Sequence, residues 1–463
     1  ISARDLRETY LPAFKDLVQK ARVKEVMCAY NAYEGEPCCG SETLLTSILR
    51  NEWGYDGLVV SDCWAINDFY TEGHHNVYPN VAEASAAAVV AGTDVECGSS
   101  YEALVEAVKK GIISEKTIDI SVLRLLKARF ELGIMDEGVH FDIPYSVVAS
   151  DEHAKVALEM AQKSIVLLQN NKNTLPLSKK MTIAVVGPNA NDSVMQWGNY
   201  NGQPPYTITL LQGIKEKAPN AKVIYYPLCG LTDATVYESL WNSCLANGNI
   251  GFSATYWNNS DLSGDVAATV QASSPITFFT MGATTPAPGV NIEKFSSSYK
   301  TSFAPGHSGK AVFRISHNGK LVIKINGKTV LEKERVANPE DIYELNFVKG
   351  EKYDIELTFV SVRRDSYMTF DLLEKSSDIS VAMKDLRKAD AIIFAGGISP
   401  KLEGEEMRVS AKGFKGGDRE DIELPDAQRD VIKRLSTLGK RLIFVNFSGS
   451  AIAMEPETKV CGA

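Results

Sequence analysis

The sequence predicts an α/β protein that is interrupted by an all-β module. Three observations predict this architecture. Short apolar strands alternate with helical segments near the N-terminus, the same alternation returns near the C-terminus, and a stretch of alternating strands separates the two. That stretch, about residues 248–375, contains two Asn-Gly dipeptides, Asn318-Gly319 and Asn326-Gly327, which are typical of hairpin turns. At 463 residues, the chain is long enough for about three domains.

An amphipathic helix is predicted at the start of the chain. Its apolar face runs from Leu6 to Ala21, and Ser2 and Asp5 form a capping pair. Three strand–helix units follow, with strands predicted at 26–31, 58–61 and 93–97 and helices at 41–53, 82–91 and 101–110. Because a closed parallel barrel needs eight such units, and because the chain opens without Met, we expect an internal segment of a longer protein.

Asp62 is the first candidate for a catalytic residue. It follows the apolar strand 58–61, and Gly57 marks the point where that strand begins. In parallel α/β folds the residues that follow the carboxyl ends of the strands form the active site. Capping of the next helix is the alternative role for this carboxylate, and the strand by itself favours neither role.

Composition excludes several classes of function. The net charge of −9 argues against a nucleic-acid partner, and no apolar run approaches the ~20 residues that cross a bilayer. None of the eight cysteines forms a CxxC pair and His74-His75 lacks ligand spacing, so we expect no metal and no cofactor. Scattered cysteines are typical of buried thiols, while one or two disulfides remain an alternative. Homo-oligomerisation is left open.

The alternation of helices and strands starts again at about residue 151. We predict a helix at 152–162 and strands at 165–168 and 183–186, and later a strand at 391–395, a helix at 424–438 and a strand at 442–445. The glycine turn at Gly187 lacks the Gly-Lys-Ser/Thr ending of a phosphate-binding loop, so nucleotide binding is not favoured.

Three carboxylates lie in the loop that follows the strand at 391–395. They are Glu403, Glu405 and Glu406. A solvated acidic loop is the common explanation for such a group. The alternative is that one of these acids works together with Asp62, because a retaining glycosidase uses two carboxyl groups about 5–5.5 Å apart. Sequence spacing does not decide between these explanations.

Six stretches occur in an order that belongs to one enzyme family: VMCAYN, NEWGYDGLVVSD, AGTDVECG, SIVLLQNNKNTLPL, AVVGPNA and GGDREDIELPDAQ. Together they resemble glycoside hydrolase family 3, the β-glucosidase and β-xylosidase group. The resemblance implies the C-terminal part of a (β/α)₈-type barrel at 1–135, a linker at 136–150, and an α/β sandwich domain in two parts, 151–247 and 376–463. It also implies that 248–375 is an inserted β-sandwich of the protective-antigen type.

The resemblance also implies roles for single residues. Asp62 falls on the nucleophile, and Tyr30 falls on the tyrosine that would hold it by a hydrogen bond. The acid/base is expected at Glu405, with Glu403 as the alternative, although the gap to the Asp418-Arg419 pair is longer than usual. Tyr30, Met27 and Trp64 are expected to contact the oligosaccharide substrate.

The implied activity is that of a retaining, exo-acting β-glycosidase, which removes terminal β-D-xylosyl or β-D-glucosyl residues. The Asp62-Cys63 pair, the ending Glu96-Cys97-Gly98 and the segment 197–205 resemble the β-xylosidase branch more closely. The competing hypothesis is a non-catalytic carbohydrate-binding protein with a degenerate barrel, in which the β-sandwich alone would bind glycans.

Overall fold

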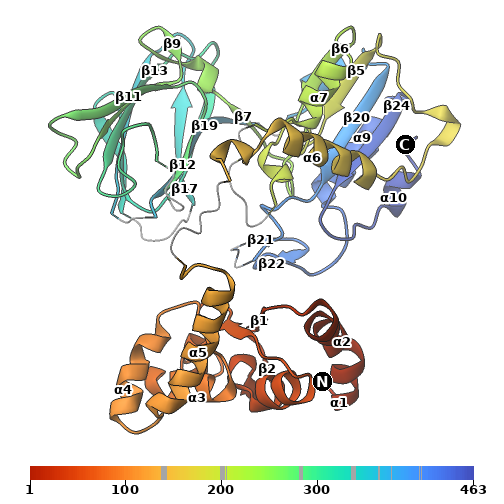
Figure 1. Ribbon diagram of the computed structural model, residues 1–463. Helices are drawn as coiled ribbons and strands as arrows, with labels where there is room; N and C mark the ends of the chain where they lie inside the picture. The colour runs from red at the N-terminus through yellow and green to blue at the C-terminus, as the bar shows by residue number, and fades with distance from the viewer. Residues whose placement is uncertain are drawn as a thin grey trace. The chain divides into compact units, whose positions relative to one another are not determined.

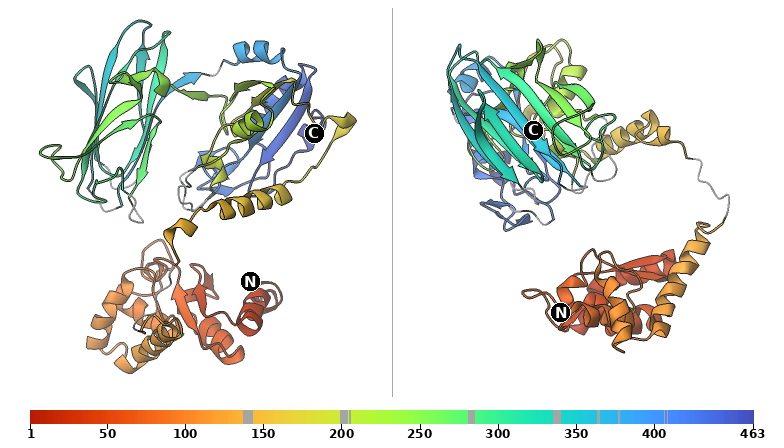
Figure 2. Two further views of the ribbon diagram at one scale, coloured as in Figure 1. Left: turned by 45° about the horizontal axis from the view of Figure 1, so that its top comes forward. Right: turned by 90° about the vertical axis from the view of Figure 1, so that its left-hand side faces the viewer.

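The computed structural model describes two compact units, residues 1–147 and 148–463, each with its own hydrophobic core (Figures 1 and 2). The described residues are 1–136, 143–198, 204, 206–280, 285–334, 340–362, 365–376, 378–405, 407 and 409–463. Among them, no helix is both long and apolar enough to cross a membrane.

The first unit opens with one continuous helical run. It comprises α1 (Ala3–Asp5), η1 (Leu6–Tyr10), α2 (Leu11–Asp16) and η2 (Leu17–Ala21). The predicted cap is confirmed, because the Ser2 hydroxyl accepts a hydrogen bond from the Asp5 N–H at 3.1 Å. The remaining elements are β1 (Glu25–Cys28), β2 (Ala32–Tyr33), β3 (Glu36–Pro37), η3 (Cys38–Gly40), η4 (Glu42–Glu52), β4 (Leu58–Ser61), η5 (Asn67–Phe69), α3 (Val81–Ala91), η6 (Ser100–Ala103), α4 (Leu104–Lys109), α5 (Glu115–Glu131) and η7 (Tyr145–Val147).

Two of the three predicted strands form a parallel pair. Strands β1 and β4 run in register from Glu25 opposite Leu58 to Cys28 opposite Ser61. The third predicted strand, 93–97, is wrong as an extended strand, because it reduces to a single bridge between Val60 and Val95. The Asp94 side chain explains the interruption. Its Oδ2 accepts the Val59 N–H at 3.0 Å and thereby takes the place of a backbone acceptor in the ladder.

Asp94 also anchors β4 to the surrounding helices. Its carboxylate is fully buried, and it is bound by Arg50 at 2.7 Å and by Arg124 at 2.8 Å. The Ser121 hydroxyl donates to the same carboxylate at 3.0 Å. Removing one partner from a buried ion pair typically costs about 3–5 kcal/mol. The network therefore holds the strand that carries Asp62 against η4 and α5.

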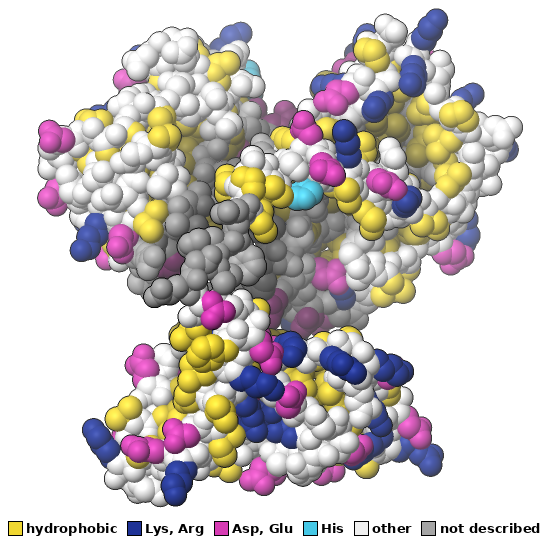
Figure 3. All heavy atoms as spheres, viewed as in Figure 1, with side chains coloured by type: hydrophobic (Ala, Val, Ile, Leu, Met, Phe, Trp, Pro, Cys, Tyr) yellow, Lys and Arg dark blue, Asp and Glu magenta, His cyan; other side chains and the backbone are white. Residues whose placement is uncertain are grey.

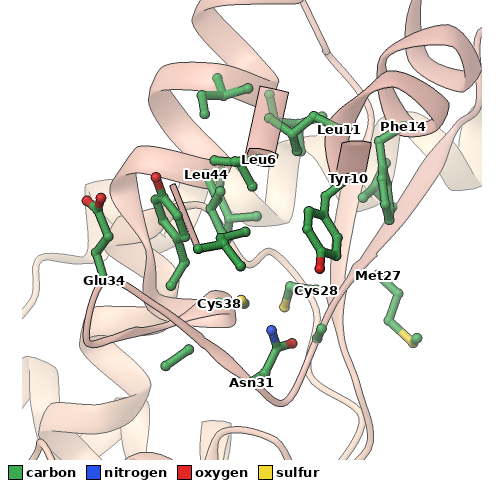
Figure 4. A pocket seen from close by; sticks show the side chains of 18 of the residues that line it. Leu6, Tyr10, Leu11, Phe14, Met27, Cys28, Asn31, Glu34, Cys38 and Leu44 are labelled. Atoms are coloured by element: carbon green, nitrogen blue, oxygen red, sulfur yellow. The ribbon is translucent and has the colours of Figure 1, made fainter. Parts of the chain in front are cut away.

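An apolar cavity of ≈ 380 Å³ lies between the opening helices, β1 and η4 (Figure 4). Side chains of Leu6, Tyr10 and Phe14 line one side, and Met27 and Cys28 of β1 line another. Asp62 does not line this cavity. Cys28, whose carbonyl accepts the Asp62 N–H, and Glu34 are among its lining residues.

The second unit contains a parallel sheet in the order β24-β20-β5-β6. Its strands are β5 (Thr182–Val186), β6 (Lys222–Tyr226), β20 (Ala391–Gly397) and β24 (Arg441–Phe447). Helices α8 (Ser380–Leu386) and α9 (Asp426–Ser436) cover one face, and α7 (Leu210–Lys217) covers the other. This arrangement is a three-layer α/β sandwich. The smaller elements are α6 (Asp151–Ser164), η8 (Asn171–Asn173), η9 (Val194–Gln196), the short strands β21 (Ser410–Ala411), β22 (Phe414–Lys415) and β23 (Asp418–Arg419), and α10 (Glu455–Thr458).

The predicted strand at 165–168 is wrong. The helix before it, α6, is confirmed, but residues 165–168 pair with no strand in the described parts of the chain. Their apolar side chains are 64–77% exposed. An apolar, β-branched run becomes a strand only where an adjacent strand accepts hydrogen bonds from its N–H groups and donates to its carbonyls. The sequence of the run does not indicate whether such a strand is present.

The second unit also contains a β-sandwich of two sheets. One sheet has the order β11-β10-β13-β18-β15-β16, with β8 and β9 at its side, and the other has the order β12-β19-β14-β17, with β7 beside β19. The strands are β7 (Val236–Ser239), β8 (Cys244–Ala246), β9 (Asn249–Ile250), β10 (Phe252–Trp257), β11 (Val266–Ala272), β12 (Ile276–Phe279), β13 (Ser296–Phe303), β14 (Gly309–His317), β15 (Lys320–Ile325), β16 (Lys328–Glu334), β17 (Glu340–Phe347), β18 (Tyr353–Val360) and β19 (Tyr367–Ser376), with the single turn η10 (Trp241–Ser243). Strands β7 and β8 precede residue 248, so the sheets also include residues before that position.

The two Asn-Gly dipeptides have different roles. Asn326 and Gly327 both have positive φ, 49° and 78°, and connect the paired strands β15 and β16, so this hairpin is confirmed. The hairpin predicted at Asn318-Gly319 is wrong, because β14 and β15 belong to different sheets. Gly319 is required there by close packing, since a Cβ atom would lie 2.4 Å from the ring of Phe359.

The core of the sandwich is aromatic. Its largest fully buried side chains include Phe252, Phe295, Tyr299, Phe303, Phe313, Phe347, Phe359 and Phe370. Tyr256 is buried among them, and its hydroxyl lies 3.0 Å from that of Tyr299. Tyr256 therefore belongs to the core of the module, whereas the next residue, Trp257, is half-buried. On the face shown in Figure 3, basic and acidic side chains are interspersed, and apolar side chains lie along α5.

Candidate active site

Asp62 is the first residue after β4, and its backbone is tied to β1. Its N–H donates to the Cys28 carbonyl at 3.1 Å, so Asp62 continues the parallel pairing by one residue. The side chain is half-buried, and Oδ1 accepts the Cys63 N–H at 2.7 Å. The following helical turn, η5, has Ile66 rather than Asp62 as its N-cap. The alternative role as a helix cap is therefore excluded.

Tyr30 holds the backbone that follows Asp62. The Tyr30 hydroxyl donates a hydrogen bond to the Cys63 carbonyl, and its ring is partly exposed. The Tyr30 carbonyl in turn lies 2.6 Å from Nε2 of His75. His75 thus contacts Tyr30, while Nδ1 of its neighbour His74 lies 3.0 Å from Oδ1 of Asp68.

The cysteines include both disulfides and buried free thiols, the two alternatives that the sequence left open. Cys28 is joined to Cys39, and Cys63 is joined to Cys97. Cys38, Cys229, Cys244 and Cys461 are free and buried. Burial raises the pKa of the Cys229 thiol to about 12, which leaves it unreactive near neutral pH.

The segment around Cys97 forms a turn that faces the Asp62 loop. The Glu96 carboxylate accepts the N–H groups of Ser100 at 2.8 Å and of Tyr101 at 2.7 Å. Burial, with added repulsion from Glu96 and Asp94, raises the pKa of Tyr101 well above its usual value. Tyr101 therefore stays a neutral donor, and it donates to the Thr93 carbonyl at 2.7 Å.

Trp64 projects from the same loop. Its side chain is 54% exposed, and its φ of 67° lies in the left-handed region. Non-glycine residues in that region are uncommon and often mark functional sites. An exposed indole two residues after a candidate nucleophile offers an aromatic face on which a sugar can stack. Met27 lines the apolar cavity beside β1, and its contact with the substrate stays a prediction.

In the second unit, the acidic loop follows β20 at the carboxyl edge of the parallel sheet. Glu403 is half-buried, and its Oε2 accepts the Ser450 hydroxyl at 2.9 Å. Arg419 donates to the oxygen of Ser450 at 3.1 Å, and its guanidinium lies over the ring of Phe414, 5.4 Å from the centroid. Glu403 is therefore bound by the loop after β24, and Arg419 of the short strand β23 in turn binds the Ser450 of that loop.

Glu405 occupies a different environment. Its side chain is exposed, and the third acid of the loop, Glu406, lies outside the described residues. Most of the segment 197–205 also lies outside them.

Sequence reasoning missed Ser450 as a partner of the acidic loop. The Asp418-Arg419 pair was the sequence feature that pointed to this contact, because Arg419 donates a hydrogen bond to the Ser450 hydroxyl oxygen.

No group of three or more His, Cys, Asp or Glu side chains in the described parts of the chain is arranged to hold a metal ion. Each unit offers a carboxylate that is held by a hydrogen bond. Asp62 is an acceptor with one oxygen held by a backbone N–H, and Glu403 is a carboxylate held by a hydroxyl.

Comparison with known proteins assigns the fold to a family. The Glycosyl hydrolase family 3 N terminal domain matches residues 1–128, and the Glycosyl hydrolase family 3 C-terminal domain matches residues 165–463. The chain belongs to glycoside hydrolase family 3. Its mixed architecture is that of the C-terminal part of a (β/α)₈-type barrel followed by an α/β sandwich.

Several curated proteins are similar in sequence. A Xylan 1,4-beta-xylosidase of Xylanibacter ruminicola is 45% identical over 100% of this chain and 54% of its own length. Beta-D-xylosidase 1 of Arabidopsis thaliana is 36% identical over 47% of this chain and 29% of its own length. The chain thus spans little more than half of the first relative and less of the second.

Solved structures support the same fold. A β-glucosidase from Kluyveromyces marxianus in complex with glucose has a TM-score of 0.72 at 23% identity, and the match covers 99% of this chain and 55% of that one. A GH3 exo-β-xylosidase in complex with a xylobiose aziridine probe has a TM-score of 0.62 at 24% identity, covering 99% and 41%. At these identities the likeness concerns the fold.

Proposed function

We propose that the full-length enzyme containing this chain is a retaining, exo-acting β-glycosidase that removes terminal β-D-xylosyl residues from oligosaccharides. The observation that carries the proposal is the position of Asp62, a half-exposed carboxylate directly after a buried parallel strand in the segment that matches the family's N-terminal domain. The choice of xylosyl over glucosyl is supported by the relative that is 45% identical and is named a xylan 1,4-beta-xylosidase.

In the first chemical step, an Asp62 carboxylate oxygen attacks the anomeric carbon. A bond forms between that oxygen and C1, and the bond from C1 to the leaving oxygen breaks. The Cys63 N–H donates a hydrogen bond to Oδ1 at 2.7 Å and thereby orients the carboxylate. We propose that the other oxygen, Oδ2, is the one that attacks. A glutamic acid of the second unit donates its proton to the leaving oxygen.

In the second step, the same glutamate removes a proton from water, and the water oxygen attacks C1 and displaces Asp62. The two inversions give net retention. We assign the acid/base to Glu403, because the Ser450 hydroxyl donates to its carboxylate and Arg419 in turn holds that hydroxyl. The exposed Glu405, which the sequence favoured, remains the alternative. A positioned carboxyl group is better suited to proton transfer, since a general acid must lie within hydrogen-bond reach of the leaving oxygen.

A panel of nitrophenyl glycosides tests the sugar. We expect the full-length enzyme to hydrolyse the β-xyloside with kcat/KM about 10–200-fold above the β-glucoside, the range over which a hydrophobic pocket discriminates one small group. The α-arabinoside serves as a second comparison. A higher kcat/KM for the glucoside would overturn the xylosyl assignment. Binding of xylo-oligosaccharides without any hydrolysis would favour the non-catalytic alternative.

We further propose that the β-sandwich insert caps the active site and limits the length of the oligosaccharide. The insert leaves the α/β domain after β6 and returns before α8 and β20, and the acidic loop follows β20 directly. The module is therefore tethered close in sequence to the proposed acid. A sandwich of roughly 130 residues has a diameter of about 30 Å, which is large enough to cover a pocket mouth.

Deletion of the insert tests the capping proposal. Replacing residues 248–375 by a Gly/Ser linker, with a second variant that removes 236–376 to include β7 and β8, should raise rates on long xylo-oligosaccharides relative to xylobiose. Rates on the short aryl xyloside provide the control for folding of the remainder. An unchanged ratio together with weaker binding to insoluble xylan would identify the insert as a binding arm instead.

A further inference from the structure

The disulfide between Cys63 and Cys97 lies next to the proposed nucleophile. Cys63 directly follows Asp62, and Cys97 follows the Val95 bridge in the neighbouring segment, 34 residues further along the chain. The cross-link thus joins the residues that follow β4 to the residues that follow Val95, at the sheet edge where Asp62 lies. Cys63 is exposed and Cys97 is half-buried, so the cross-link is not part of a hydrophobic core.

Hydrogen bonds run beside the disulfide and connect the same two segments. The Ser61 N–H donates to the Val95 carbonyl at 2.9 Å, and the Cys97 N–H donates to the Ser61 hydroxyl at 3.0 Å. Beyond the cross-link, the Trp64 N–H donates to the Cys97 carbonyl at 2.7 Å. The residues on both sides of Asp62 are therefore fastened to the segment that ends at Cys97.

Cys63 acts directly on the carboxylate. Its N–H is the donor that binds Oδ1 of Asp62 at 2.7 Å, so the orientation of the Cys63 peptide sets the orientation of the carboxylate. The next residue, Trp64, has a φ of 67°, a conformation that costs free energy for any residue with a Cβ atom. Its side chain is 54% exposed, so packing of the indole contributes little to holding this conformation. Backbone restraints must hold it instead.

We propose that the Cys63–Cys97 disulfide is a positioning element for the glycosidase reaction: it fixes the Cys63 peptide, whose N–H orients the attacking carboxylate of Asp62. The inference rests on the proposed function. When the cross-link opens, the Trp64 backbone relaxes from its left-handed conformation and the Cys63 N–H turns away from Oδ1. A displacement of about 1 Å at a reacting group lowers the rate by about 10²-fold. The effect falls mainly on kcat, and KM changes less, because groups other than Trp64 also bind the sugar.

The second disulfide provides an internal reference. Cys28 and Cys39 are only 5% and 1% exposed, whereas Cys63 is exposed. A reductant in solution therefore reaches Cys63–Cys97 first. Dithiothreitol transfers two hydrogen atoms to the sulfur atoms of Cys63 and Cys97, the bond between them breaks, and the reagent closes to its cyclic disulfide.

The test is mild reduction of the full-length enzyme under native conditions, followed by initial-rate assays on nitrophenyl β-xyloside. Quenched samples are alkylated and their cysteine peptides are mapped, so that the extent of reduction at each pair is known. We expect kcat to fall about tenfold or more as Cys63–Cys97 is reduced, with KM changing less than about threefold. Reoxidation should restore kcat, which a collapsed structure would not do.

Two variants make the result specific. The double variant Cys63→Ala/Cys97→Ala and the single variant Cys97→Ala should show the same loss in kcat, because either removes the cross-link, and neither should respond to dithiothreitol. Complete reduction of Cys63–Cys97 with kcat within about twofold of the oxidised enzyme would overturn the inference. If the variants fail to fold, reduction of the wild-type enzyme decides alone. Activity that persists in Asp62→Ala would instead overturn the proposed function.

Discussion

Replacing Asp62 by alanine in the full-length enzyme should lower kcat on nitrophenyl β-xyloside by about 10³-fold or more, because no covalent glycosyl intermediate can form. Asp56→Ala is a matched control. Asp56 lies in the same unit and is 82% exposed in a surface pair with Lys127, and such pairs contribute little to stability. We expect the control to retain wild-type rates. Activity of Asp62→Ala within a few-fold of wild type would remove Asp62 from the mechanism.

Azide should distinguish a missing nucleophile from a damaged fold. The alanine variant leaves space where the carboxylate was, and azide that enters this space attacks C1 from the vacated face. The product should be an α-glycosyl azide of inverted configuration, which nuclear magnetic resonance identifies directly. A β-glycosyl azide would mean that another residue had attacked first and that the nucleophile lies elsewhere.

The second large effect is expected at Glu403. Without a general acid, substrates with poor leaving groups should slow by about 10²–10⁴-fold, because their leaving oxygen must be protonated as it departs. Dinitrophenyl β-xyloside, whose leaving group needs no proton, should slow far less in this step. The measurement is the ratio of kcat/KM on xylobiose to that on the dinitrophenyl substrate for Glu403→Ala.

Glu405→Ala is the matched comparison within the same loop. Because its side chain is exposed while Glu403 is held by Ser450, we expect Glu405→Ala to keep the wild-type ratio of the two substrates. If Glu405→Ala shows the dependence on leaving group and Glu403→Ala does not, the roles are exchanged and the assignment that the sequence favoured is correct.

Local pattern predicted the elements that depend on local chemistry. The run Leu58–Ser61 is apolar and β-branched, and the strand that it forms has the predicted bounds. The hairpin at Asn326-Gly327 formed because both residues tolerate positive φ. Asp62 was identified for the same reason, because a polar residue after such a strand lies at its carboxyl end.

The errors arose where a distant partner decides the structure. Asn318-Gly319 carries the same local signal as the true hairpin, but the flanking strands pair in different sheets. The run at 165–168 is apolar enough for a strand, but no described strand pairs with it. Residues 93–97 do not form an extended strand beside β4, because the Asp94 carboxylate binds the Val59 N–H in place of a backbone carbonyl. None of these outcomes is encoded in the segment itself.

The candidate site was predicted in part for a related reason. Family motifs indicated Asp62 and the acidic loop, but they did not indicate which cysteines would pair. Cys63 pairs with Cys97 because the two segments that carry them lie side by side in the fold. Composition and spacing do not reveal that neighbourhood. The Ser450–Glu403 contact likewise joins loops that are 47 residues apart.

Trapping of the covalent intermediate tests the central claim most directly. A 2-deoxy-2-fluoro-β-xylosyl fluoride should inactivate the full-length enzyme. The fluorine at C2 slows both steps, while the fluoride leaving group at C1 keeps the first step fast enough for the glycosyl-enzyme to accumulate. After proteolysis, mass spectrometry should find one fluoroxylosyl group on the peptide that contains Asp62, bonded to that carboxylate. A label on Glu403, Glu405 or any other residue, or hydrolysis that proceeds with no labelled enzyme, would contradict the account.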